Sequence, residues 1–507
     1  MSQTKAQLLD ALIASLLPAS DSSVDIGSNG VRFANGYFDT LYGDGSNLTG
    51  VTSTTINSNA DNRVITGSGT ANTLNGESNL LFDGSILTVD GVNVGKGANS
   101  VLNNTVLGRS ALDAAVTGNH NTAIGKTALT TNTSGANNTA VGANSLVLNT
   151  TASDNTGLGF QALQDNSTGT SNTAVGSNSI SNNTTGNYNT GVGKDSLKAS
   201  TTASNNTAVG YDSLTLNTTG YSNTAVGANS GYAVTTANDC TFIGKDAGKD
   251  ITDGQFNTFV GSLAGSNTNS GTYLNTFVGY NAGVNNGNGN HNVFLGANAG
   301  LNNEAWDNIF IGNYSGDANT SGTQNLFVGK NSGTANTTAS YNVFLGHEAG
   351  KSNTTGTRNT AVGPLALDAN TTANDSQAFG YLALSANTTG GSNSAFGSSA
   401  LGTNTTGASN CAFGTGTLAS NSTASNNTAF GASALNQNST GTRNVAVGST
   451  ALDANTSAND NTAIGNNSLG LNSTGSLNTA VGSDALKNNT TGTSLTGIGY
   501  EALRENT

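Results

Sequence analysis

One repeat of seventeen residues governs most of this 507-residue chain. The string Asn-Thr-Ala-Val-Gly recurs from residue 103 to the end, and its final glycine marks twenty-four copies, from Gly108 to Gly499. The spacing is 17 except for one step of 18, Gly261 to Gly279, and one of 16, Gly296 to Gly312. So short a period is too small for a helical hairpin repeat of about 33–40 residues. It fits one coil of a parallel β-solenoid, in which each coil stacks on the next.

The composition agrees with a thin core. Hydrophobic residues make up 34% of the chain, against about 45–50% in globular proteins. Disorder is disfavoured, because charged residues are only 9% and there are only two prolines. We therefore predict an all-β chain, a parallel β-solenoid or β-roll of about 24 coils. At a strand spacing of about 4.8 Å, these coils form a rod of roughly 110 Å.

Stacking predicts columns of identical residues, and positions are counted here from the anchor glycine. Position −4 is Asn in all repeats but three, where Cys240, Ser376 and Leu495 replace it. Such a column predicts side-chain hydrogen bonds from coil to coil along the rod. The alternative is that the column is a polar recognition stripe.

Phenylalanine forms two further columns. In seven consecutive repeats Phe replaces Ala at position −2, and the Leu at position +4 becomes Gly in the same repeats. The exchange roughly conserves volume, so positions −2 and +4 are predicted to touch inside the rod. A second Phe run lies at position −1 and is also predicted to stack in the core. The two predicted core ladders are Phe242, Phe259, Phe277, Phe294, Phe310, Phe327 and Phe344, and then Phe379, Phe396, Phe413 and Phe430.

Three segments are expected. Residues 1–20 are predicted to form a short N-terminal helix for anchoring or trimerisation. Thr4 begins a capping box, an apolar face follows the box, and Pro18 ends the helix. Residues 21–102 predict a small β collar or neck, and residues 103–507 the solenoid shaft. The chain stops inside a repeat with no polar capping coil. We expect the natural polypeptide to be longer or cleaved, with a distal tip beyond this sequence.

The repeat unit Asn-Thr-Ala-Val/Ile-Gly-x-x-Ser/Ala resembles the head repeats of trimeric autotransporter adhesins of the YadA type. That resemblance implies a parallel β-roll in which three chains pack around one axis, although those heads usually repeat at a shorter period. Segments 25–35, 41–50 and 62–67 resemble N-terminal parts of fibre proteins from tailed phages, especially marine ones. Together the resemblances imply a homotrimeric phage fibre with adhesin-like repeats.

No catalytic, cofactor-binding or metal-binding residues are predicted, and no cofactor. His120, His291 and His347 fall in different coils. The net charge of −13 with scattered Lys and Arg argues against a nucleic-acid or anionic-membrane partner, and no apolar run reaches the roughly 20 residues of a membrane span. Cys240 and Cys411 form no disulfide framework. Trp306 is either packed over a neighbouring coil or chain, or an exposed sugar contact.

The favoured function is a non-enzymatic virion fibre, a tail or tail-associated fibre assembled in the host cytoplasm. Its partners would be a baseplate, tail or capsid protein, bound through residues 1–97, and a host surface glycan or protein, bound through the distal tip. No receptor-binding residue can be named. The alternatives are a bacterial trimeric surface adhesin and a capsid-attached decoration fibre. A surface-binding solenoid that uses Thr columns is weaker, because Val293, Ile309, Leu326 and Val343 interrupt the Thr at position −3.

Overall fold

The computed structural model describes residues 55–57, 63–67, 73–82, 86–269 and 271–506. The predicted N-terminal helix at residues 1–20 lies outside the described residues, as does most of the predicted collar at residues 21–102. The described residues contain β-strands and one 3₁₀ turn, η1 (Ala98–Ser100), and no α-helix. They belong to two compact units, residues 1–59 with 65–76 and residues 60–64 with 77–507, which are described separately.

The first unit holds β1 (Thr55–Asn57), the start of β3 (Thr73–Phe82) and most of β2 (Arg63–Gly67). Strand β1 pairs in parallel with β3, with Thr55 opposite Thr73.

In the second unit, an antiparallel meander leads into the repeats. Strand β4 (Ile86–Val89) pairs with the end of β3, β5 (Val92–Gly95) pairs with β4, and β6 (Thr105–Gly108) pairs with β5. Because β5 covers the outer edge of β6, the first strand of the stack offers no free backbone edge to another sheet.

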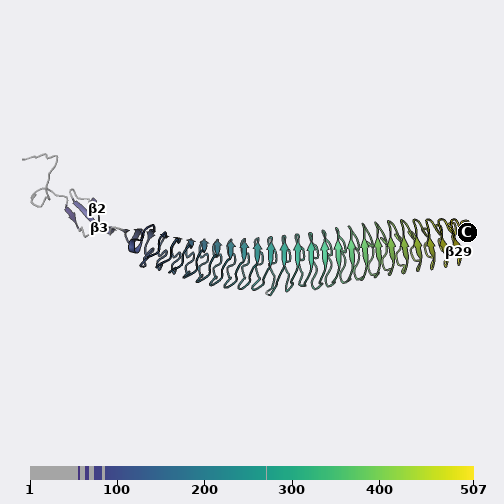
Figure 1. Ribbon diagram of the computed structural model, residues 1–507, viewed down its shortest axis with the longest axis horizontal. Coiled ribbons are helices and arrows are strands. Elements are labelled where there is room, and N and C mark those ends of the chain that lie inside the picture. The colour runs from purple at the N-terminus through teal and green to yellow at the C-terminus, as the bar shows by residue number, and fades with distance from the viewer. Residues whose placement is uncertain (1–54, 58–62, 68–72, 83–85, 270, 507) are drawn as a thin grey trace, which may run out of the picture. The chain divides into compact units, whose positions relative to one another are not determined.

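From β6 onward the shaft is a single parallel β-solenoid, as the repeat predicts. Each coil contributes one short strand at positions −3 to −1, and every strand pairs in register with the strand of the next coil, as Thr122 does with Thr139. Figure 1 shows these strands in one continuous row. The strands are β7 (Thr122–Ile124), β8 (Thr139–Val141), β9 (Thr156–Leu158), β10 (Thr173–Val175), β11 (Thr190–Val192), β12 (Thr207–Val209), β13 (Thr224–Val226), β14 (Thr241–Ile243), β15 (Thr258–Val260), β16 (Thr276–Val278), β17 (Val293–Leu295), β18 (Ile309–Ile311), β19 (Leu326–Val328), β20 (Val343–Leu345), β21 (Thr360–Val362), β22 (Gln377–Phe379), β23 (Ser394–Phe396), β24 (Cys411–Phe413), β25 (Thr428–Phe430), β26 (Val445–Val447), β27 (Thr462–Ile464), β28 (Thr479–Val481) and β29 (Thr496–Ile498).

The anchor glycine is required by backbone geometry. At Gly142 the φ angle is 139°, a conformation that side chains disfavour. A Cβ atom there would also collide with the carbonyl of Gly159 in the next coil. The same contact recurs at the other anchors from Gly108 to Gly482, so this glycine permits the close approach of successive backbones.

Three columns form the apolar core. Positions −2 (mostly Ala or Phe, with Val in one coil and Gly in three), +3 (Ala, Ser or Thr) and +4 (Leu, Ile or Gly) are buried in nearly all coils. The predicted contact between −2 and +4 is confirmed. A Cβ on Gly316 would lie 2.7 Å from Cδ2 of Phe310, so the glycine makes the space that the ring fills. Rings of adjacent coils stack, with Phe259 and Phe277 at a centroid distance of 4.7 Å and an interplanar angle of 4°.

The buried Asn column at position −4 joins coils differently from the predicted side-chain pairs. Its main bonds are to the backbone. The amide N–H of Asn138 donates to Oδ1 of Asn121 at 3.0 Å, and Nδ2 of Asn121 donates to the carbonyl of Gly135 at 2.9 Å. Each asparagine thus satisfies a backbone donor and a backbone acceptor that the narrow coil buries.

A second buried Asn column, at position +7, was not singled out from the sequence. Here the side chains do bond to one another: Nδ2 of Asn149 donates to Oδ1 of Asn132 at 2.9 Å. Val234 and Ile251 interrupt the +7 column in two successive coils. Cys240, which lies between them in the sequence, interrupts the −4 column, and all three side chains are buried. The amide ladders are therefore replaced together by an apolar cluster.

Candidate interaction surface

Side chains alternate in direction along each three-residue strand, and the outward-pointing ones of all coils form a continuous outer face. The middle residue at −2 points into the core, so the residues at −3 and −1 point outward. We call this surface the strand face, meaning positions −3 and −1 of strands β6 to β29. It contains no charged residue.

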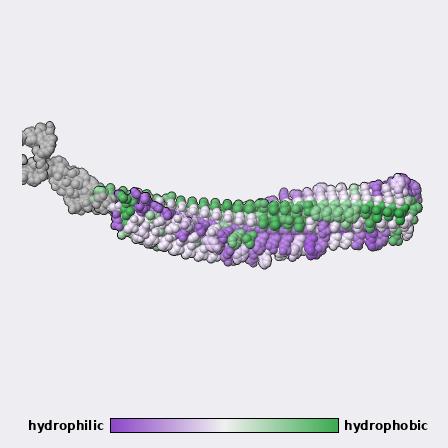
Figure 2. All heavy atoms as spheres, viewed as in Figure 1, coloured by the Kyte–Doolittle hydropathy of each residue, from purple (hydrophilic) through white to green (hydrophobic). Residues whose placement is uncertain are grey.

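The −1 column of the strand face is apolar in every coil. Its members keep much of their surface accessible: Leu158 is 45% exposed, Leu295 46% and Ile464 40%. Figure 2 shows the resulting hydrophobic stripe along the shaft. The column consists of Leu107, Ile124, Val141, Leu158, Val175, Val192, Val209, Val226, Ile243, Val260, Val278, Leu295, Ile311, Val328, Leu345, Val362, Phe379, Phe396, Phe413, Phe430, Val447, Ile464, Val481 and Ile498.

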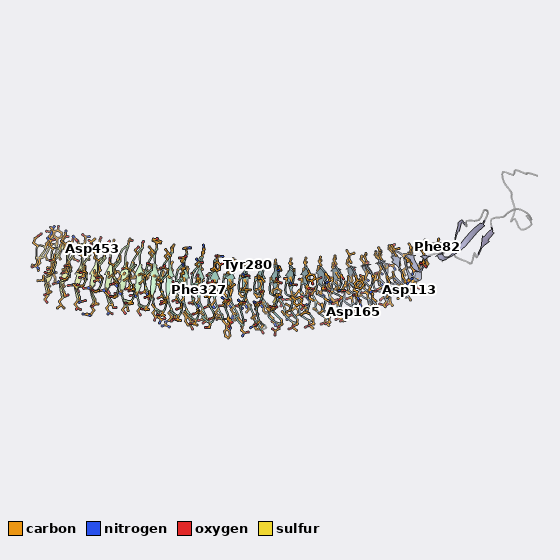
Figure 3. The ribbon with its side chains drawn as sticks, turned by 180° about the vertical axis from the view of Figure 1, so that it is seen from behind. Phe82, Asp113, Asp165, Tyr280, Phe327 and Asp453 are labelled. Carbon is orange, nitrogen blue, oxygen red and sulfur yellow. The ribbon has the colours of Figure 1, made fainter. Side chains whose placement is uncertain are left out.

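The two Phe ladders lie on opposite sides of the sheet. All seven rings from Phe242 to Phe344 are fully buried, as predicted; Figure 3 labels Phe327 among them. For Phe379, Phe396, Phe413 and Phe430 the predicted core position is wrong. They stand at −1 on the strand face, where the first three are half-buried and Phe430 is 39% exposed.

These four outer rings nevertheless stack on one another, with centroids of Phe396 and Phe413 4.4 Å apart. A shift of one residue along a strand reverses the face to which the side chain points.

The strand face changes composition along the shaft. Position −3 is Thr in the first coils, then Val293, Ile309, Leu326 and Val343 in four successive coils. Beside the outer Phe ladder, position −3 becomes small or polar, as at Ser394 and Cys411. Since exposed apolar patches larger than a few hundred Å² mark interaction sites, the strand face is the main candidate for binding another macromolecule.

The three histidines of the shaft lie in different coils and do not come together. Within the described ranges no three His, Cys, Asp or Glu side chains gather in a way that could hold a metal ion. His291 Nδ1 lies 3.3 Å from Asp307 Oδ1, His347 lies near Glu348 in its own coil, and His120 Nε2 lies 3.1 Å from Asn103 Nδ2.

The cysteines are free and also lie apart. Burial raises the pKa of the Cys240 thiol to about 11, which keeps it protonated and unreactive. Burial also raises the pKa of Cys411, which lies on the strand face.

One carboxyl group stands out electrostatically. Burial raises the pKa of Asp317 to about 6, and its Oδ1 is buried without a hydrogen-bond partner. Burial raises the pKa of Asp368 and Asp453 in the same way, at the same position +5 of other coils. Their separation by whole coils leaves them without the paired carboxylates that hydrolytic sites use.

Trp306 both contacts a neighbouring coil and exposes part of its ring, so it has features of both predictions, a packed residue and an exposed sugar contact. Its indole Nε1–H donates to the carbonyl of Asn288 in the adjacent coil at 3.2 Å, yet the residue is 53% exposed. Half-exposed aromatic residues also occupy the corner before the strand in nearby coils, among them Phe256 and Tyr273. The sequence signal that could have found this cluster is the concentration of aromatic residues at positions −6 and −5.

No protein-family model matches this chain, and no curated protein matches it. In the part of the chain that the structure describes, no helix is long and apolar enough to cross a membrane.

Proposed function

We propose that this chain is the shaft of a homotrimeric, non-enzymatic fibre of a tailed phage, in which the strand faces of three chains pack against one another. The observation that carries the proposal is the unbroken apolar column at position −1. In a monomer much of this stripe stays in contact with water, whereas burying it between chains stabilises an assembly by about 25 cal/mol per Å².

The absence of charge supports packing between identical chains. In a symmetric assembly each residue of the strand face meets an equivalent residue at the same level, so like charges would repel. Positions −3 and −1 avoid charge in all coils, although Lys, Asp and Glu occur elsewhere on the shaft. The resemblance of the repeat to YadA-type heads supports three chains.

Attachment to a virion through residues 1–97 rests on the resemblance of segments 25–35, 41–50 and 62–67 to phage fibre proteins. The shaft would hold a host-recognition element away from the particle. Immunogold labelling with antibodies against residues 103–507 should decorate fibres on purified virions. Labelling confined to the surface of uninfected bacteria would instead indicate the adhesin alternative.

The assembly is tested by light scattering of the purified chain during size-exclusion chromatography. We expect the mass of three chains for the wild type. Val328→Glu places charge on the strand face and should dissociate the trimer. The matched control is Lys330→Glu, two residues later and beyond Gly329, which should leave the trimer intact. A monomeric wild type, or equal effects of the two substitutions, would contradict the proposal.

A further inference from the structure

One stretch of the shaft departs from the regular seventeen-residue period. Between residues 253 and 307 the period changes twice, first to 18 and then to 16 residues. Both changes fall in the loop that precedes the corner of the coil: the extra residue lies between Thr268 and Thr272, and the deletion lies beside Glu304. About twenty other coils fold without these changes, so the stability of the coil does not require them.

The same loops lose a regular hydrogen-bonding column. At position +8 the hydroxyl group of Thr or Ser donates to a carbonyl of the next coil, as Thr235 does to Thr252 O at 3.1 Å. In the altered coils this position is Asn269, Gly287 and Glu304, and the column resumes at Thr320. Solvent-facing amides join the same coils at position +6: Asn267 Nδ2 donates to Asn285 Oδ1 at 2.9 Å, and both residues are exposed.

Aromatic and apolar side chains gather at the adjacent corner. Phe256 is 52% exposed, Tyr273 39%, Leu274 52% and Trp306 53%, and the His291 side chain is exposed between them. We call these five residues the aromatic corner. Elsewhere exposed corner tyrosines, such as Tyr188, stand in single coils. Tyr273 and Trp306 both occupy position −6, two coils apart, which corresponds to about 10 Å along the shaft.

Hydrogen bonds to neighbouring coils hold the aromatic corner in place. The backbone N–H of Tyr273 donates to Asn290 Oδ1 at 2.8 Å, and the indole N–H of Trp306 donates to Asn288 O at 3.2 Å. His291 is held beside Asp307 at 3.3 Å. Because the Tyr273 backbone and the Trp306 and His291 side chains are already held in place, less conformational entropy is lost there when a ligand binds.

The charge around the aromatic corner selects the class of ligand. The sequence has no Lys or Arg from residue 250 to residue 329, whereas it has five carboxylates there. Phosphate groups, acidic sugars and nucleic acids would therefore meet net negative charge. An uncharged ligand with hydroxyl groups and apolar C–H faces fits, because aromatic rings offer a flat apolar surface and Asn, His and Asp offer hydrogen bonds.

We propose that the aromatic corner is a lateral binding site for a neutral glycan chain that lies along the shaft. Tyr273 and Trp306 are the two platforms on which sugar rings stack. His291, Asp307 and Asn290 are the groups that hydrogen-bond to sugar hydroxyls. Recognition then occurs on the shaft itself, and this inference holds whether or not the shaft belongs to a virion.

Trp306 is the only tryptophan of the chain, so its fluorescence reports on this site alone. The full chain in its native assembly is titrated with chitotetraose, cellotetraose and maltotetraose, and with tetragalacturonate as the acidic control. At least one neutral tetrasaccharide should shift the Trp306 emission saturably, and tetragalacturonate should not. Tyr273→Ala should weaken binding about tenfold, and Tyr273→Phe should retain it. Tyr188→Ala, at the neighbouring position −5 of a regular coil, should leave it unchanged.

Several results would overturn the proposal. One is that none of the three neutral glycans gives a saturable shift. Another is that tetragalacturonate binds as tightly as they do, or that Tyr188→Ala weakens binding as much as Tyr273→Ala. Failure of acrylamide to quench Trp306 in the native assembly would show that another chain covers the aromatic corner, and would equally exclude a glycan site.

Discussion

The two phenylalanine ladders differ by one position in a three-residue strand, and this difference separates core from surface. The inner ladder, Phe242 to Phe344, is fully buried and requires Gly at position +4. The outer ladder, Phe379 to Phe430, keeps Ala at −2 and a buried Leu at +4, as at Leu418. From Phe259 onward the inner rings stack with nearly the same geometry as the outer rings, whereas Phe242 is tilted by 49° against Phe259. Ring stacking is therefore a property of the repeat, whereas burial is decided by the face to which the strand turns each ring.

Phenylalanine therefore has two different roles in the two ladders. An inner ring contributes its apolar area to the stability of one chain. An outer ring leaves part of its area accessible, and in the proposed trimer that area contributes to association. Substitutions that act on one ladder and not on the other can break this comparison or sharpen it.

The largest expected effect is that of Phe310→Ala. Removing a fully buried ring opposite Gly316 leaves a cavity that the stacked coils cannot close, at a cost of about 3–5 kcal/mol. Phe413→Ala on the strand face should cost under about 1.5 kcal/mol within a single chain, because the ring is already partly hydrated. Urea denaturation of both variants, under conditions in which the chain is monomeric, measures the difference. Equal losses would refute the assignment of the two faces.

The next largest effect on the free energy of unfolding comes from exchanging the residues at positions −2 and +4, Phe310 and Gly316. Gly316→Leu alone should cost about 2–4 kcal/mol, because the new side chain collides with Phe310 in a crowded core and adopts a left-handed backbone, φ 58°. The double variant Phe310→Ala/Gly316→Leu restores the pairing found in other coils and should lose less than either single variant. A double-mutant cycle in urea measures this coupling. Additive losses would show that the two positions do not share one space.

The buried amide column should give an effect of about 2 kcal/mol. Asn427→Ala removes the acceptor of the backbone N–H of Asn444, which bonds to Asn427 Oδ1 at 3.0 Å. That N–H would then be buried without a partner. Thr423→Ala in the same coil, at an exposed position, is the control and should be nearly neutral. The shift in the urea midpoint distinguishes the two, and a neutral Asn427→Ala would mean that water replaces the lost oxygen.

The smallest predicted effect depends on pH. Because burial raises the pKa of Asp317 to about 6 from an ordinary value of 3.8, ionisation costs more in the folded chain than in the unfolded one. Asp317 therefore destabilises the shaft increasingly as pH rises from about 4 through 6. Asp317→Asn should raise stability by about 1 kcal/mol at pH 8, after allowance for solvent screening, and have no such effect below pH 4. Thermal denaturation at the two pH values tests this.

The sequence predicted the coil, its period and the inner ladder, because Phe at −2 changes together with Gly at +4. The same signal could have corrected the outer ladder: Leu at +4 does not change where Phe379 to Phe430 occur, so those rings need no space inside. The Asn column at +7 was visible in the repeat, but its partners depend on how the loop folds back. Left-handed backbone at non-glycine residues, such as Leu418 with φ 52°, follows from the tight corners and has no signature in residue type.

The identical register between successive coils has a consequence for how such a shaft changes length. Every strand from β6 to β29 meets its neighbour through the same set of backbone bonds. Duplication or loss of one seventeen-residue unit therefore creates no new kind of contact, and it alters reach by about one strand spacing of 4.8 Å. Gain or loss of whole repeats can therefore change the length of the shaft in small steps. The insertion of a single residue, in contrast, falls in a loop, as between Thr268 and Thr272.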